Sequence, residues 1–182
     1  MDIRTLCLGV LSRGETTGYG IKKHFEQAFR HFFPAGFASV YPALAALERD
    51  GLATASDVPQ DGRPDKRVYA ITERGRASLH EALMAAPARH RVRSEFLACL
   101  YFADQLPRAR LAALLDERER DIEALLAHID RLLDSDDCPA TDRAVAECGR
   151  STLQAQLDHL VGHREALLAL AADHGREEVR RA

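Results

Sequence analysis

The chain of 182 residues is long enough to bury one large hydrophobic core or two smaller ones. Its 46% hydrophobic and 29% charged residues are typical of a water-soluble globular protein, and no apolar run reaches the ~18 residues that a membrane-spanning helix needs. The N-terminus also lacks the pattern of a secretory signal peptide, so we expect a cytoplasmic protein.

The net charge of −3 conceals a difference between the two halves of the chain. Residues 1–91 hold 13 Lys/Arg and 10 Asp/Glu, a net charge of +3, whereas the remainder holds 12 and 18, a net charge of −6. A basic half joined to an acidic half fits one segment that binds a polyanion and another that binds protein. Differences of this size also arise by chance, so charge supports nucleic-acid binding only weakly.

Three helices are predicted before residue 52, because apolar side chains recur at helical spacing in three segments that turn-forming residues separate. The third helix is predicted to start at Ser39, whose side chain can cap the free amides. Pro42 then falls in the first turn, where its missing N–H has no cost. Asp50 and Gly51 end this helix. Its inner face consists of Val40, Ala43, Leu44 and Leu47.

A β-hairpin is predicted next. Residues 52–55 and 66–71 have strand-like patterns, and the turn formers of residues 59–65 lie between them. A fourth helix begins at the N-cap Thr72 and ends by Pro87. Three helices followed by a hairpin are typical of a winged helix-turn-helix, so residues 1–86 are predicted to form a DNA-binding domain.

Residues 92–176 are predicted to be helical, with breaks before Pro107 and at the polar residues 134–139. The last helix runs from about Asp142 to Ala171. It has leucines at nearly heptad spacing, and Arg164 occupies one position of this seam. Either the preceding helix or a second subunit must cover the seam. The fold class is therefore mainly α with a small β-hairpin: an N-terminal winged helix-turn-helix and a C-terminal helical domain.

Four blocks of sequence now stand in a specific order: Leu8-Gly9-Val10-Leu11; Gly18-Tyr19-Gly20-Ile21; Ser39-Val40-Tyr41-Pro42-Ala43-Leu44-Ala45-Ala46-Leu47-Glu48-Arg49-Asp50-Gly51-Leu52; and Gly62-Arg63-Pro64-Asp65-Lys66-Arg67-Val68-Tyr69-Ala70-Ile71-Thr72-Glu73-Arg74-Gly75. Together they resemble the PadR family of bacterial transcriptional regulators. The half that begins Arg93-Ser94-Glu95-Phe96-Leu97 looks like the long helical extension of one branch of that family. The chain departs from the family at Gly20, where a charged or polar residue is commoner.

Side chains that can reach DNA occur in three places. The third helix has the outward face that must enter a major groove, the second helix crosses the DNA backbone in such modules, and the hairpin tip carries cations that can follow phosphates. The predicted DNA-binding residues are Tyr19, Lys22, Lys23, Ser39, Tyr41, Arg63, Lys66 and Arg67. The alternatives are that Ser39 is only a cap, that Tyr41 packs against the hairpin, and that the hairpin is merely solvated. Arg49 is expected to form a structural ion pair.

The family resemblance implies a homodimer on a pseudo-palindromic operator, and a repressor that a small aromatic or drug-like effector releases. The predicted dimer interface is the seam of Leu153, Leu157, Leu160 and Leu167, which could instead pack within one chain. The effector pocket is predicted from Phe96, Tyr101 and Phe102, for which core packing is the commoner role.

Other functions have less support. His159 and His163 lie four residues apart without a third ligand at fixed spacing, so no metal site and no cofactor is predicted. No catalytic motif is recognisable, so we expect no enzyme. Cys7 and Cys99 are expected in the core, whereas Cys138 lies in a polar loop and makes a thiol-responsive regulator one alternative. A helical protein-interaction module whose winged helix does not bind DNA is the other.

Overall fold

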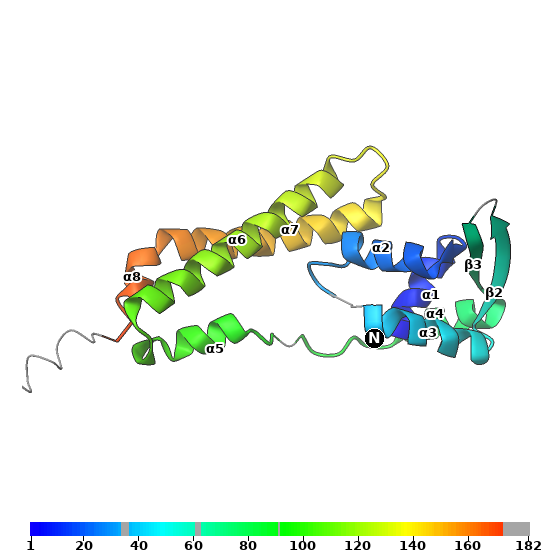
Figure 1. Cartoon of the computed structure of the whole chain (residues 1–182), viewed down its shortest axis with the longest axis horizontal. Helices are drawn as coiled ribbons and strands as arrows, with labels where there is room; N and C mark the ends of the chain where they lie inside the picture. The colour runs from blue at the N-terminus through cyan, green and yellow to red at the C-terminus, as the bar shows by residue number, and fades with distance from the viewer. Residues whose placement is uncertain (34–36, 61–62, 91, 173–182) are drawn as a thin grey trace, which may run out of the picture. The chain divides into compact units, whose positions relative to one another are not determined.

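The computed structural model describes residues 1–33, 37–60, 63–90 and 92–172, and it divides into two compact units, Met1–His90 and Arg91–Ala182. The fold is mainly helical with one small antiparallel sheet, as predicted (Figure 1). Along the first unit the elements are α1 (Ile3–Ser12), β1 (Thr16–Thr17), α2 (Gly18–Ala28), α3 (Phe37–Arg49), β2 (Ala53–Gln60), β3 (Arg63–Ile71) and α4 (Glu73–Met84).

The first unit has the predicted order of three helices, a hairpin and a fourth helix. Its sheet contains a third strand that was not predicted, because the two residues of β1 are too few to show an alternating pattern. The strand order is β1-β3-β2, and β1 pairs Thr16 with Tyr69 and Thr17 with Val68. Since Thr17 also caps α2 by accepting a hydrogen bond from the backbone N–H of Gly20 (3.0 Å), β1 joins the start of α2 to the hairpin.

The core of the first unit lies between α1, α3 and the sheet. Cys7 and Leu11 of α1 are buried against the inner face of α3, and Ile21, Phe25 and Tyr69 close the cluster. Burial raises the pKa of the Cys7 thiol to about 12, so this cysteine is an unreactive core residue as expected.

The start of α3 corrects the prediction. The helix begins at Phe37, so Ser39 is its third residue and not its N-cap, and Pro42 lies beyond the first turn. The two residues before Ser39 carry no capping side chain, which is why the sequence pattern pointed to Ser39. Pro42 removes one intrahelical hydrogen bond, and because it is exposed, water can reach the turn that lacks it.

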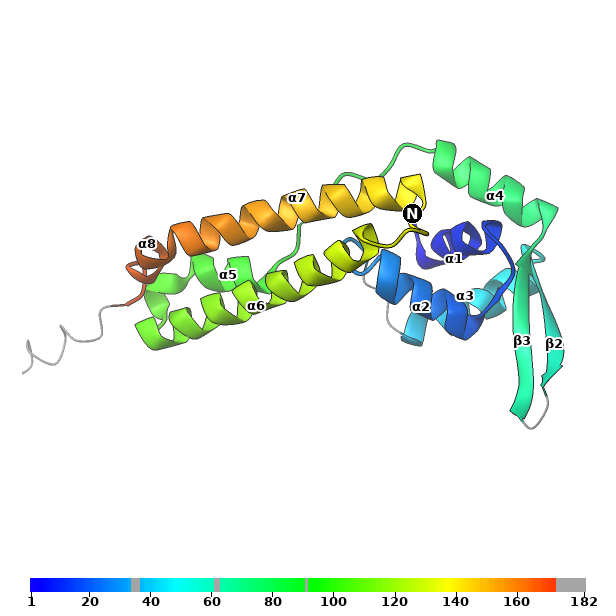
Figure 2. The same cartoon turned by 90° about the horizontal axis from the view of Figure 1, so that it is seen from above.

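The second unit consists of α5 (Glu95–Tyr101), a 3₁₀ turn (Ala103–Gln105), α6 (Arg108–Leu133), α7 (Ala140–Gly162) and α8 (Arg164–Leu168). The long helices α6 and α7 run antiparallel beside each other (Figure 2) and bury Leu111, Leu115, Ile122, Ile129, Leu153 and Leu160. None of these described helices, nor those of the first unit, is both long and apolar enough to cross a membrane.

Two predicted helices of this unit are interrupted. The helix predicted up to Leu106 ends at Tyr101 and continues as the 3₁₀ turn, and the last helix breaks at His163. The second break follows Gly162, whose helix propensity is low, and the backbone of His163 leaves the helical region at φ −114° and ψ 13°. Arg164 then donates hydrogen bonds to Asp116 and Glu119 of α6, so this polar residue of the seam joins two helices.

Thr72 connects the end of α3 to the start of α4. Its hydroxyl caps α4 by accepting from the backbone N–H of Gly75 (3.0 Å), as predicted, and donates to the carbonyl oxygen of Gly51 (2.9 Å). Its backbone N–H donates to the carbonyl oxygen of Leu52 (3.1 Å). One side chain therefore holds two helix ends together.

Replacing Thr72 by Val should lower the free energy of unfolding by about 1–2 kcal/mol, because the cap and the bond to Gly51 are both lost. Urea unfolding followed by circular dichroism measures this change. Thr72→Ser keeps the hydroxyl and is the control. If Thr72→Val and Thr72→Ser were equally stable, the hydroxyl would not connect the two helices.

Candidate nucleic-acid interface

The buried face of α3 determines which of its residues point outward. Val40, Leu44 and Leu47 are fully buried, whereas Tyr41, Pro42, Ala45 and Arg49 are exposed. The two predicted faces of this helix are thereby confirmed. Near the start of the helix the outward face carries Tyr41 beside the small Pro42 and Ala45, which suits close approach to a flat or grooved partner, and Arg49 lies at the far end.

An open groove of about 570 Å³ lies between α2, α3 and the wing, by which we mean the β2–β3 hairpin. Its lining residues are Thr17, Gly18, Tyr19, Tyr41, Gln60, Asp65, Lys66, Arg67 and Tyr69. Four of the predicted DNA-binding residues, from three separate elements, therefore meet at this groove. Sequence reasoning missed Thr17, Gln60 and Tyr69, because only the pairing of β1 with β3 and of Gln60 with Arg63 brings them there.

Tyr41 is held close to the start of α2. A Cβ atom on Gly18 would lie 2.7 Å from Cε1 of Tyr41, so the ring of Tyr41 rests where a larger residue at position 18 would stand. Tyr19, which follows Gly18 in the chain, is 64% exposed, and Tyr41 is 45% exposed. Two exposed tyrosine side chains from neighbouring helices therefore line the same groove.

The lysines of α2 have different surroundings. The side chain of Lys22 is only 16% exposed; its ammonium lies 3.1 Å from Glu26 and 5.9 Å from the centre of the Tyr19 ring. Lys23 is exposed. Lys22 is therefore partly neutralised by its own helix, whereas Lys23 presents its charge to the solvent.

The cations of the wing differ in the same way. Arg67 donates hydrogen bonds to both carboxylate oxygens of Glu48 in α3, at 2.8 and 2.9 Å, and these bonds raise its pKa above the ordinary value. Lys66 is exposed, and among the residues that the structure describes its ammonium group has no hydrogen-bond or ion-pair partner. Arg63 begins β3, and its side chain lies outside the described residues, as do Asp61 and Gly62. Ser39 is half-buried within α3.

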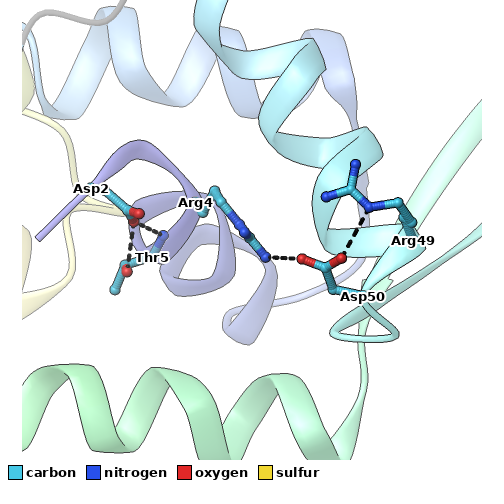
Figure 3. Close-up of polar contacts among 5 residues, drawn as sticks. All are labelled: Asp2, Arg4, Thr5, Arg49 and Asp50. Carbon is cyan, nitrogen blue, oxygen red and sulfur yellow. Dashed lines mark hydrogen bonds and ion pairs between the residues drawn. The ribbon is translucent and has the colours of Figure 1, made fainter.

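The C-terminal end of α3 is fixed by a turn and by ion pairs. Gly51 adopts a left-handed conformation with φ +69°. The N–H of Gly51 donates to the carbonyl oxygen of Glu48 (3.0 Å), and the N–H of Leu52 donates to the carbonyl oxygen of Leu47 (2.8 Å). Together these two hydrogen bonds form a Schellman motif. Asp50 accepts hydrogen bonds from Arg4 of α1 and from Arg49 (Figure 3). Arg49 therefore has the expected structural ion pair.

At the N-terminal end of α1, Asp2 is the helix cap and accepts from the backbone N–H of Thr5 at 2.9 Å (Figure 3). This hydrogen bond holds the pKa of Asp2 below its ordinary value. Since Asp2 orders the turn that carries Arg4, the cap supports the contact between α1 and the end of α3.

The residues predicted as an effector pocket have unlike surroundings. Phe96 packs against the core of the second unit, whereas Tyr101 and Phe102 are 81% and 59% exposed and contact each other edge to face. None of the residues of α5, all of which the structure describes, is fully buried. Cys99 belongs to this helix and is exposed, so its expected core position is wrong: the short helix has only a few contacts with α6.

The leucine seam is covered within the chain. Leu153 and Leu160 are buried against α6, and Leu157 and Leu167 pack on the same cluster. This placement favours the alternative in which the seam packs inside one chain. His159 and His163 stack with ring centroids 4.3 Å apart, and within the described residues no three His, Cys, Asp or Glu side chains are grouped as a metal site.

Two family models match the chain and together span both units. The model of the transcriptional regulator PadR-like family matches residues 7–81, and that of the virulence activator alpha C-terminal region matches residues 92–170. The negative transcriptional regulator PadR of Bacillus subtilis is 29% identical over 123 residues, which are 67% of this chain and 68% of that protein.

Solved structures are similar over nearly the whole chain. The PadR-like transcriptional regulator BC1756 of Bacillus cereus has a TM-score of 0.82 at 26% identity, over 92% of this chain and 99% of that chain. Bacillus subtilis PadR in complex with operator DNA has a TM-score of 0.74 at 26% identity, over 92% of this chain and 97% of that chain. The chain belongs to the PadR-like family of transcriptional regulators, in the branch with a long helical C-terminal extension. This is a family of regulators and not of enzymes.

The ion pairs of Asp50 predict a pH-dependent stability. Hydrogen bonds from Arg4, which has the larger effect, and from Arg49 lower the pKa of Asp50 from its ordinary value of 3.8. A carboxyl group whose pKa is lower in the folded state stabilises the fold above its unfolded pKa and loses that contribution as the pH falls through the folded pKa. We therefore expect Asp50→Asn to be less stable than the wild type at pH 7, and the difference to shrink as the pH falls below about 3.8.

Urea unfolding at a series of pH values measures this difference. Glu15→Gln removes an exposed carboxylate from the same unit and controls for net charge. A difference between Asp50→Asn and the wild type that stayed constant from pH 7 to pH 3 would contradict the role given to the carboxylate.

Proposed function

We propose that the chain is a sequence-specific DNA-binding transcriptional regulator whose α3 enters the major groove while the wing follows the phosphate backbone. The observation that carries this proposal is the meeting of Tyr19, Tyr41 and Lys66 at one groove between α2, α3 and the wing. Aromatic hydroxyls can donate to phosphates or base edges, and an unpaired cation on a hairpin can bind phosphate. The operator complex of Bacillus subtilis PadR supports the same use of the fold.

The proposed contacts are ranked by what surrounds each side chain. Tyr41 and Lys66 are exposed at the groove and carry most of the binding, and the exposed Tyr19 and Lys23 add contacts to the DNA backbone. Ser39 is half-buried and Lys22 is paired with Glu26, so both contribute less. Arg63 stays a predicted phosphate contact.

The second unit serves, in this proposal, to form a homodimer. The exposed apolar side chains of α5, Leu97 and Tyr101, offer surface that a second copy can cover, since the leucine seam is already occupied by α6. Two-fold symmetry then places two copies of α3 about one DNA turn apart and requires a pseudo-palindromic operator.

We further propose that the protein is a repressor and that a small aromatic or drug-like effector releases it from DNA. The repressor role is supported by the similarity to a negative transcriptional regulator. The effector rests on the family resemblance alone: Bacillus subtilis PadR has been solved with p-coumaric acid, but at 22% identity that likeness supports the fold and not the ligand.

Selection of bound duplexes from a random DNA pool tests the proposed function. The full-length protein should enrich a pseudo-palindromic sequence, and its affinity should fall steeply with added salt. If no duplex were enriched at low salt, the protein would be a helical protein-interaction module instead.

Replacing Lys66 by Ala should weaken binding to the selected duplex and to unrelated duplexes alike. The logarithm of the binding constant falls linearly with the logarithm of the salt concentration. The magnitude of this slope should decrease by about 0.9 for each Lys66 side chain that binds a phosphate. Fluorescence anisotropy titrations at several salt concentrations give the slope. Arg120→Ala removes an exposed cation from α6 and is the matched control. Equal effects of the two variants would mean that Lys66 acts only through net charge.

Replacing Tyr101 by Glu should weaken the homodimer about tenfold or more, because a carboxylate would be buried in an apolar interface. Sedimentation equilibrium at several protein concentrations measures the dissociation constant. Tyr19→Glu introduces the same change at an exposed tyrosine of the first unit and should leave the dimer unchanged. A dimer that tolerates Tyr101→Glu would place the interface elsewhere.

A further inference from the structure

We propose that Arg67 is a positioning residue that fixes the wing to α3 through Glu48, in place of the phosphate contact predicted for it. This proposal rests on the proposed DNA-binding function. Lys66, and not Arg67, supplies the positive charge with which this part of the wing contacts the DNA phosphates. Arg67 sets the spacing between the wing and the DNA-reading face of α3.

The guanidinium of Arg67 is held on three sides. Its Nη2 donates to both carboxylate oxygens of Glu48, at 2.8 and 2.9 Å, across nineteen positions of sequence. Its Nη1 lies 3.9 Å from Asp57, the residue opposite it in the β2–β3 register. Its Cζ lies 5.9 Å from the centre of the ring of Tyr69, which belongs to the core. Contacts with α3, with β2 and with a core residue therefore fix the position of the Arg67 side chain.

The ion pair lies where it can control the groove. Glu48 follows Tyr41 by seven residues, which is two helical turns, so both lie on the same side of α3. Arg67 and Lys66 are neighbours on β3 and both line the groove, but only Arg67 is bonded to α3. The groove therefore contains one cation that is bound to α3 and another that is exposed to the solvent.

Binding a phosphate through Arg67 would have an electrostatic cost. Arg67 would have to give up two charge-assisted hydrogen bonds, and the carboxylate of Glu48 would be left unpaired beside the negatively charged DNA backbone. A paired Arg67 and Glu48 are together neutral and displace no counterion from DNA. The two roles of Arg67 thus predict opposite effects when Glu48 loses its charge.

Glu48→Gln is the deciding variant. If Arg67 positions the wing, the loss of the ion pair should lower affinity for the selected duplex about threefold to fivefold, the size expected for one exposed hydrogen-bonded pair. If Arg67 binds phosphate, the same variant removes a repelling charge and frees a cation, so affinity should rise. Asp57→Asn removes an equal charge 3.9 Å from Arg67 without breaking the bonds to Glu48, and it therefore measures the effect of charge alone.

Charge reversal supplies a second, independent measurement on the full-length chain. Arg67→Glu should bind poorly, and adding Glu48→Arg to it should recover at least part of the lost affinity. Arg67→Ala should lower affinity without reducing the salt slope, unlike Lys66→Ala. Circular dichroism of each variant establishes that it is folded.

The possible outcomes separate the two proposals. Tighter binding by Glu48→Gln, no recovery in the charge-reversed double variant, or a reduced salt slope for Arg67→Ala would each overturn the positioning role while leaving DNA binding intact. A wild-type protein that binds no duplex would overturn the proposed function, and the positioning role with it.

Discussion

The burial of one face of α3 is the constraint on which the proposed DNA-binding surface depends. Val40, Leu44 and Leu47 are fully buried against α1 and the sheet, so rotation of the helix would expose large apolar side chains to water. The Schellman turn at Gly51 and the contact between Arg4 and Asp50 fix the end of the helix. The direction of Tyr41 therefore follows from packing on the opposite side of α3.

Pairing matters more than the number of charges in this first unit. Its excess of basic residues is small, and two of its predicted DNA contacts, Lys22 and Arg67, are bound to carboxylates of the same unit. Lys66 and Lys23 remain exposed at the surface. Cations that are already paired within the unit contribute less to DNA binding than exposed cations such as Lys66.

The second unit shows how a heptad-like pattern can be satisfied inside one chain. The seam leucines of α7 lie on α6, and Arg164 fills its polar position by pairing with Asp116 and Glu119. Exposed apolar side chains of this unit include Leu97 and Tyr101 on α5 and Val145 and Val161 on α7. Association through this unit would therefore use a different surface from the one that the leucine spacing indicates.

The sequence by itself determined the order of helices and strands, the inner and outer faces of α3, the cap at Thr72 and the family, because these depend on local periodicity and on short motifs. The tertiary structure decided the rest. Strand β1, the start of α3 at Phe37 and the break at His163 have local signals too weak to read. The covering of the leucine seam by α6 and the pairing of Arg67 with Glu48 depend on which segments meet in space. Glu48 and Arg67 are nineteen positions apart, and only the folded hairpin brings the cation of one to the carboxylate of the other.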